Sequence, residues 1–234
     1  MNEMSPCCAF DPSLPKDSTG WFEIDPLRSF CLGMILLEIE SLSPGKEGIF
    51  TSREAVRTLK MGPRRLRSFM AARVALKRLA RQLGLVDKSL LDRAIETLDP
   101  DGVAPCLAES GFPCSVSHSF RFVAAVANRH PVGLDLEVVS NKALRTWHLF
   151  MSPKEQGLLS VSGLSPDKAA TRAWTIKEAA AKALGLPLVQ AFREVEIIRI
   201  DEKEGMMKYQ EKIYPARHVE GAGHVITLIT FDDL

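Results

Sequence analysis

The 234-residue chain lacks the patterns that mark several protein classes. Its five cysteines are scattered, with no Cys-x-x-Cys pair, so neither a zinc site nor a disulfide framework is indicated. The longest apolar run, residues 30–37, is far shorter than the roughly 20 residues that span a bilayer. Residues 1–10 do not have the charged-then-apolar layout of a signal peptide. We therefore expect no membrane association and a cytoplasmic setting.

A strong overall charge is also missing. The formal net charge is +1, which argues against general nucleic-acid binding. Basic residues are nevertheless concentrated between Arg53 and Arg81, where ten Lys or Arg residues accompany a single acid, Glu54. Such a block is usually a solvated helix face. It would also attract phosphates or an acidic partner, whereas nucleic acid is disfavoured because interleaved aromatic residues are absent.

Two common catalytic motifs do not occur. The chain has no Gly-x-x-x-x-Gly-Lys-Ser/Thr loop for nucleoside triphosphates and no Gly-x-Ser-x-Gly hydrolase turn. The neighbouring residues Ser117 and His118 could suggest a hydrolase, but adjacent side chains of an extended chain point to opposite sides. This pair is either a surface turn with an idle histidine or a donor of hydrogen bonds to phosphate oxygens.

An apolar strand is predicted for residues 131–139, and it carries two acids. Side chains two apart on a strand share a face, so Asp135 and Glu137 should project together. Adjacent carboxylates among apolar neighbours repel each other unless a cation lies between them, and Mg²⁺ favours such oxygen ligands. Alternatively, this face meets solvent while Leu134 and Leu136 form the buried face.

A helix is predicted for residues 168–184, where an Ala-rich stretch ends before Gly185 and Pro187. Glu178 and Lys182 lie four residues apart and so share one face of this helix. A carboxylate beside an ammonium on a rigid face suits a metal-bridged phosphate. An exposed ion pair of small energetic effect would produce the same spacing.

We predict an α+β fold of two similar lobes related by a pseudo-two-fold axis. Each lobe would be a small, mostly antiparallel sheet packed with helices, with the candidate site in the cleft between the lobes. Further helices are expected at residues 65–83, 88–98 and 153–159, and strands at 30–39, 114–127, 194–201, 206–213 and 224–231. A faint repeat, in which residues 50–54 are similar to 151–155, supports lobes at 1–128 and 129–234.

Three motifs occur in a fixed order: Ser117-His118, Gly133-x-Asp135-x-Glu137 and Trp174-x-x-Lys177-Glu178-x-x-x-Lys182. In this order and spacing the chain resembles the 4′-phosphopantetheinyl transferase superfamily. The similarity is greatest to the larger, two-lobed type that acts on carrier proteins of polyketide, peptide and siderophore synthesis. The motifs span residues 112–188, and weaker similarity extends back to residue 50.

The resemblance implies roles for individual residues. Asp135, Glu137 and Glu178 would hold Mg²⁺ on the pyrophosphate of coenzyme A. The phosphates of coenzyme A would be contacted by Lys182, Lys177, Ser117, His118, Arg65 and Arg73, with Arg73 reaching the 3′-phosphate.

Catalytic roles are implied for Glu178, Lys182 and Glu155. Glu155 belongs to a segment similar to the family's Phe-Ser-x-x-Glu, with Met151 in the aromatic position, and would position or deprotonate the incoming serine. The chain departs from the family at residues 101–105, where a basic residue is usual and none is present. One contact to the nucleotide is therefore not expected here.

The implied activity is Mg²⁺-dependent transfer of the 4′-phosphopantetheine arm of coenzyme A to a serine of an apo acyl or peptidyl carrier protein. The nucleotide end of coenzyme A would lie in the first lobe and the metal in the second, and a monomer would suffice. Two alternatives remain at this point. They are another Mg²⁺-dependent phosphotransferase and a catalytically retired module that only binds coenzyme A or a carrier protein.

Overall fold

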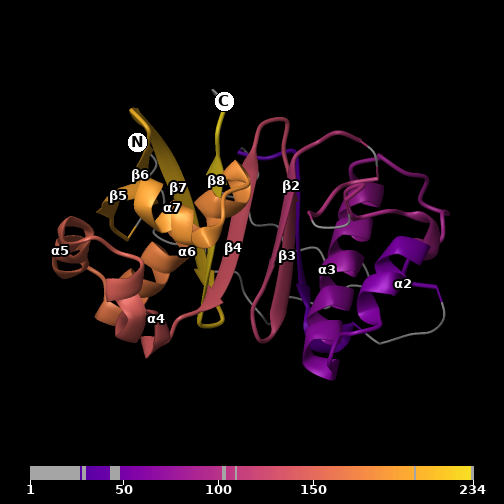
Figure 1. Ribbon diagram of the computed structural model, residues 1–234, viewed down its shortest axis with the longest axis horizontal. Helices are drawn as coiled ribbons and strands as arrows, with labels where there is room; N and C mark the ends of the chain where they lie inside the picture. Colours follow the sequence, from indigo (N-terminus) through magenta and orange to yellow (C-terminus); the bar gives the residue numbers. More distant parts are fainter. Residues whose placement is uncertain are drawn as a thin grey trace, which may run out of the picture.

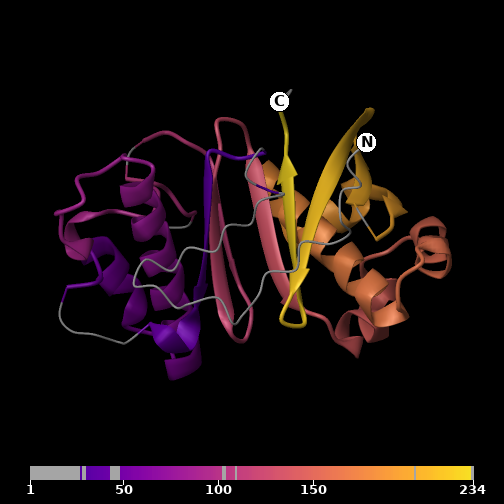
Figure 2. The ribbon, with the colours of Figure 1, turned by 180° about the vertical axis from the view of Figure 1, so that it is seen from behind.

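The computed structural model describes residues 27, 30–42, 48–101, 104–108, 110–202 and 204–232. Over these residues the fold is α+β, with two antiparallel sheets packed against helices, as predicted. The two sheets stand next to each other at the centre of the molecule, with α2 and α3 at one end and α4 to α7 at the other (Figures 1 and 2). No helix within the described ranges is long and apolar enough to cross a membrane.

The first sheet has three strands in the order β1-β3-β2. Its strands are β1 (Gly33–Glu38), β2 (Cys114–His118) and β3 (Phe122–Ala127). Two helices, α2 (Ser52–Thr58) and α3 (Pro63–Gln82), belong to the same lobe, and α3 packs on this sheet. Helix α3 begins with Pro63 at its first position, where a missing N–H costs nothing.

The second sheet has five strands in the order β4-β8-β7-β6-β5. They are β4 (Val132–Val138), β5 (Val195–Ile200), β6 (Glu204–Tyr209), β7 (Lys212–Gly221) and β8 (His224–Thr230). The helices of this lobe are α4 (Asn141–Thr146), α5 (Pro153–Val161), α6 (Pro166–Leu184) and α7 (Leu188–Glu194). Helix α6 lies on β4 and β8 and ends at Gly185, whose left-handed conformation suits glycine.

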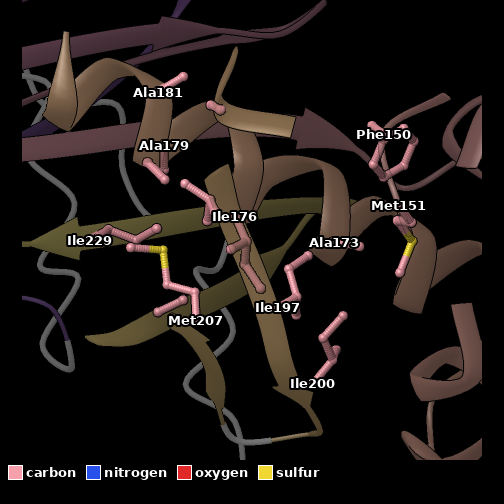
Figure 3. Packing of buried hydrophobic residues seen from close by; sticks show 14 of the residues in the cluster. Phe150, Met151, Ala173, Ile176, Ala179, Ala181, Ile197, Ile200, Met207 and Ile229 are labelled. Atoms are coloured by element: carbon pink, nitrogen blue, oxygen red, sulfur yellow. The ribbon is translucent and has the colours of Figure 1, made fainter. Parts of the chain in front are cut away.

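Each lobe has its own apolar core. In the second lobe, small residues of α6 such as Ala173 and Ala179 let the helix approach the sheet, where Ile176 meets Met207 and Ile229 (Figure 3). The first lobe packs α3 on β1 and β3. A third cluster joins β1 and β3 to β4 and β8, so apolar burial also holds the two sheets together.

The sheets meet where β2 lies against β4. No ladder of backbone hydrogen bonds is formed between these strands. Instead, the Ser115 hydroxyl accepts a hydrogen bond from the Leu134 amide at 3.1 Å, and Lys182 donates to the Leu134 carbonyl at 3.0 Å. Side chains thus satisfy backbone groups of β4 that a neighbouring strand would otherwise pair.

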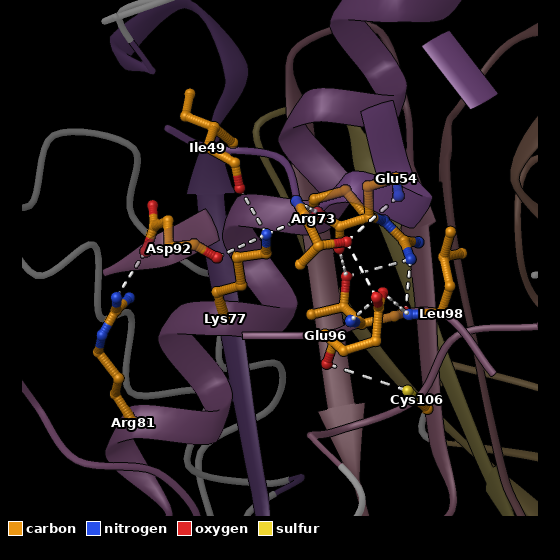
Figure 4. Close-up of polar contacts among 11 residues, drawn as sticks. Ile49, Glu54, Arg73, Lys77, Arg81, Asp92, Glu96, Leu98 and Cys106 are labelled. Carbon is orange, nitrogen blue, oxygen red and sulfur yellow. Dashed lines mark hydrogen bonds and ion pairs between the residues drawn. The ribbon is translucent and has the colours of Figure 1, made fainter. Parts of the chain in front are cut away.

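The predicted repeat has a physical counterpart in two buried ion pairs. Glu54 in the first lobe and Glu155 in the second each complete a capping box at the start of a short helix. Each carboxylate then pairs with a buried lysine of the lobe's long helix, Lys77 and Lys177 respectively, at 2.6 Å. Figure 4 shows the first of these networks. Lys77 of the first lobe therefore corresponds in position to Lys177 of the second.

Removing one member of such a pair should be costly. We expect Lys177→Met to lower the free energy of unfolding by about 3 kcal/mol, because Glu155 would be left charged in the interior. Lys154→Met is a matched control, since Lys154 is exposed and pairs with Glu196 at the surface; its effect should stay below about 0.5 kcal/mol. Urea unfolding measures both, and equal effects would contradict this role of the buried pair.

Two predicted elements differ in the structure. Residues 88–98 form only a short 3₁₀ turn, Asp92–Ala94, rather than a helix. Carbonyls of this segment accept side-chain hydrogen bonds from α3 instead, with Lys77 donating to Asp92 and Arg73 to Thr97. Residues 206–213 are not one strand, because the chain turns between β6 and β7 where Gln210 has a positive φ of 54°.

Candidate active site

The site is built where α6 crosses β4. Gly133 on β4 makes this contact possible, since a Cβ there would lie 1.8 Å from the carbonyl oxygen of Ala179. The close approach brings Asp135, two residues along the strand, under the last turns of α6. Asp135 is 1% exposed, so its carboxylate must find partners within the protein.

Lys182 of α6 is the main partner of Asp135. Its ammonium donates to Asp135 Oδ1 at 2.7 Å, to Ser117 Oγ at 3.1 Å and to the carbonyl oxygen of Leu134 at 3.0 Å. Glu178 Oε2 lies 3.7 Å from the same nitrogen. Ser117 donates its own proton to Asp135 Oδ1 at 2.8 Å. The second oxygen of Asp135, Oδ2, is buried and has no partner.

The acids of the site act on one another. Burial and the neighbouring Asp135 carboxylate raise the pKa of Glu178 to about 7, against an opposing effect of Lys182. Burial, followed by Asp135, also raises the pKa of Glu137. The structure therefore brings Asp135, Glu137 and Glu178 within electrostatic reach of one another, and the single ammonium of Lys182 does not offset the raised pKa values of Glu137 and Glu178.

The donor set suits a hard divalent cation. Three carboxylates lie within electrostatic reach of one another, and Asp135 Oδ2 is a buried acceptor without a donor, which is the kind of oxygen that Mg²⁺ would take. No three His, Cys, Asp or Glu side chains in the described ranges are, however, already grouped as a metal site.

His118 borders this cluster. Its side chain is exposed on the opposite side of β2 from buried Ser117, as the strand alternation predicts. Partial burial and the Lys182 ammonium lower the pKa of His118, with a smaller contribution from Arg64. The imidazole is therefore neutral at pH 7. Arg64 and Arg65 are both exposed at the start of α3.

A cavity of about 400 Å³ adjoins the cluster. Its walls come from both lobes: Pro105 to Leu107, Ser110 to Cys114, Pro131, Val132, Lys182 and Ala183. Lys182 thus faces both the carboxylates and the cavity. The segment 101–105, which lacks the basic residue usual in the family, is only partly described, because Gly102 and Val103 lie outside the described residues.

Arg73 lies in the first lobe beside this cavity. It is buried, it donates to the carbonyl and hydroxyl oxygens of Thr97, and its Nε has no partner. Burial lowers the pKa of Arg73, while Glu54 and the cavity residues Cys114 and Cys106 oppose the shift. Figure 4 shows Arg73 beside Glu54 in this network.

Glu155 and Lys177 lie elsewhere. Both are almost fully buried and bind each other at 2.6 Å. Glu155 also accepts from the amides of Ser152 and Ile197, while Lys177 donates to the carbonyls of Phe192 and Val195. Their polar atoms are thus engaged inside the second lobe, and we assign neither residue a contact with a substrate.

Part of the chain is similar to a known protein family. Residues 131–229 match the family model ACPS, the 4′-phosphopantetheinyl transferase superfamily. The second lobe is a domain of this superfamily. Comparison with curated proteins gives no match.

Phosphopantetheinyl transfer is the general activity of this superfamily. The matched region runs from the start of β4 into β8, and it contains Asp135, Glu137, Glu178 and Lys182. It excludes β2, so Ser117 and His118 come to the site from outside the match through the contact of β2 with β4. The side-chain cluster around Asp135 is therefore built from both lobes.

One contributor was missed in the sequence. Ser115, which accepts a hydrogen bond from the Leu134 amide, could have been found because it lies two residues before Ser117 on the same face of the strand.

The raised pKa of Glu178 predicts how the free energy of unfolding of the metal-free protein depends on pH. Between pH 4.5, its ordinary value, and about 7, the folded protein retains a proton that the unfolded chain has lost. The free energy of unfolding should therefore fall as the pH rises through this window, by about 1–3 kcal/mol from this residue. Glu178→Gln should match the wild type near pH 4.5 and be more stable above pH 7. Urea unfolding in EDTA tests this, and parallel pH profiles would contradict it.

Proposed function

We propose that this protein transfers the 4′-phosphopantetheine arm of coenzyme A to a serine of an apo acyl or peptidyl carrier protein and releases adenosine 3′,5′-bisphosphate. The observation that carries the proposal is the contact between Asp135 and Lys182, with Glu178 beside them and Asp135 Oδ2 unpaired. The carboxylates could bind a divalent ion and the neighbouring ammonium a diphosphate, so the arrangement suits the two ligands together.

We assign Asp135, Glu137 and Glu178 as the residues that hold Mg²⁺. The bound ion would neutralise negative charge on the diphosphate as its phosphorus–oxygen bond breaks. Asp135 is suited to an inflexible ligand position because it is buried and hydrogen-bonded by Ser117 on one oxygen only. Glu137 and Glu178 are partly exposed and border it.

The hydrogen-bond donors of the site, some charged and some neutral, suit the phosphate groups of coenzyme A. Lys182 lines the cavity, and its ammonium can turn from Asp135 to donate to a phosphate oxygen. His118 is neutral at pH 7 and so would donate a single hydrogen bond rather than supply a charge. Arg64, whose charge is felt at His118, adds a cation on the same side.

Glu178 is the group we propose to accept the proton of the incoming serine. The serine oxygen would form a bond to the phosphorus next to the pantetheine, and the bond from this phosphorus to the adenosine bisphosphate would break. Glu178 is partly exposed beside Lys182, so its carboxylate can meet the hydroxyl of the incoming serine. Glu155 is not available for this step, because Lys177 and two backbone amides occupy its oxygens.

The cavity is the place that we propose for the nucleotide part of coenzyme A. Its walls combine apolar and polar surface, with Lys182 at one edge, which suits a ring system attached to phosphate. Arg73 lies behind Cys106 and Cys114 of this wall, and its free Nε makes it the candidate for the 3′-phosphate. Residues 1–128 would then serve the nucleotide end and residues 129–234 the metal and pyrophosphate.

The test mixes the protein with coenzyme A, Mg²⁺ and a panel of apo carrier proteins. Intact mass should reveal addition of one phosphopantetheine to a carrier, with an equal amount of adenosine 3′,5′-bisphosphate released. Retention of coenzyme A without bisphosphate across the panel would identify a binding module instead. Transfer that persists undiminished in EDTA would reject the metal assignment.

A further inference from the structure

Lys182 holds the position that a metal ion would need. Its Nζ lies 2.7 Å from Asp135 Oδ1 and 3.7 Å from Glu178 Oε2, so one ammonium is shared by two of the three proposed metal ligands. A divalent ion bound to the same two carboxylates would lie close to this nitrogen. Two cations at such a distance, in a partly buried site, repel each other strongly.

We infer that Lys182 determines which species the site accepts, by admitting a divalent ion together with a phosphate ligand and discriminating against the ion alone. This inference rests on the proposed function, because it takes Asp135 and Glu178 as metal ligands. It gives Lys182 a role in the ligand-free protein, in addition to its contact with phosphate.

The contacts of Lys182 explain the discrimination. Without a phosphate, the ammonium has only the carboxylates as charged partners, since Ser117 Oγ and the Leu134 carbonyl are neutral. An ion that arrives alone can bind Asp135 Oδ2, but it then lies beside the Lys182 ammonium on Oδ1 with no further anion to offset either charge. Repulsion between the two cations weakens the binding of the bare ion.

A diphosphate in the neighbouring cavity removes this penalty. Lys182 lines the cavity, and its side chain is 30% exposed on a flexible four-carbon stem. It can turn from Asp135 toward a phosphate oxygen and keep an anionic partner. The carboxylates are then free for the ion, so the ion and the diphosphate should bind with positive cooperativity.

The experiment measures Mg²⁺ and Mn²⁺ binding to the full-length protein without coenzyme A, by titration calorimetry and by Mn²⁺ paramagnetic resonance. Replacing the ammonium with a neutral side chain in Lys182→Met should tighten binding of the bare ion by about tenfold or more. Lys182→Gln is a second neutral variant, and Lys182→Arg should bind the bare ion as weakly as the wild type. Lys168→Met changes a lysine of the same helix that pairs with Glu220, and should have no effect.

Coenzyme A provides the second readout. In the wild type it should increase the affinity for Mn²⁺, and this increase should shrink in both neutral variants. Unchanged or weaker binding of the bare ion by both neutral variants overturns the inference. The proposed function fails separately, if the wild type with coenzyme A and Mg²⁺ releases no adenosine 3′,5′-bisphosphate with any carrier protein of the panel.

Discussion

Asp135→Asn is expected to lower the rate of carrier-protein modification by about 10³-fold or more while the protein remains folded. Asparagine keeps the size of the side chain and one oxygen, so Ser117 and Lys182 retain an acceptor. It removes the charge that would hold the metal ion and leaves Lys182 with Glu178 as its remaining carboxylate partner. The chemistry should therefore suffer far more than the packing.

The measurement is the initial rate of bisphosphate release at saturating coenzyme A and carrier protein, with circular dichroism as the check on folding. Glu211→Gln is the control, because its side chain is 93% exposed and pairs only with Lys208. That variant should turn over like the wild type. Normal turnover by the folded Asp135→Asn protein would refute the metal assignment at its central ligand.

Local spacing was enough to predict part of this site. Asp135 and Glu137 share a strand, and Glu178 and Lys182 share a helical face, because each pair follows the period of one regular element. The same periodicity located β4, β8, α3 and α6 to within a few residues. Elements that bury a regular apolar face can be recognised in this way without any knowledge of their neighbours.

Contacts between different helices and strands could not be predicted from the spacing of residues within one element. Lys177 and Glu178 are adjacent on α6, yet successive residues of a helix point about 100° apart, so Lys177 turns inward to Glu155 while Glu178 faces the site. The sequence gives no sign of which lysine is buried until the sheet under the helix is known. Lys182 on Asp135 is likewise a contact between residues far apart in the chain.

The secondary structure was also predicted wrongly where backbone carbonyls accept hydrogen bonds from side chains. Residues 88–98 have a plausible helical pattern, but their carbonyls accept hydrogen bonds from lysine and arginine side chains of α3. Tertiary contacts here replace the i to i−4 bonds that the local pattern favours. The buried network around Glu54 and Thr97 therefore decides the local structure as well as the position of Arg73.

Gly133→Ala should be the most damaging small substitution in the second lobe. A Cβ at this position would lie 1.8 Å from the Ala179 carbonyl oxygen and 2.9 Å from the Ala183 amide nitrogen, both backbone atoms of α6 that no side-chain rotation can move. The strand and the helix must separate, which exposes the core between them. We expect a loss of about 4–5 kcal/mol in the free energy of unfolding, or failure to fold.

The separation should also reach the site, because Asp135 follows Gly133 by two residues and its bond to Lys182 needs the present spacing of β4 and α6. Any folded Gly133→Ala protein should therefore have lost most of its transferase activity. Gly157→Ala is the matched control: no atom lies within 4 Å of its added Cβ, and Gly157 is exposed on α5. That change should raise stability by about 0.5–1 kcal/mol through helix propensity. Urea unfolding compares the two, and a Gly133→Ala protein as stable as the wild type would mean that β4 does not lie so close to α6.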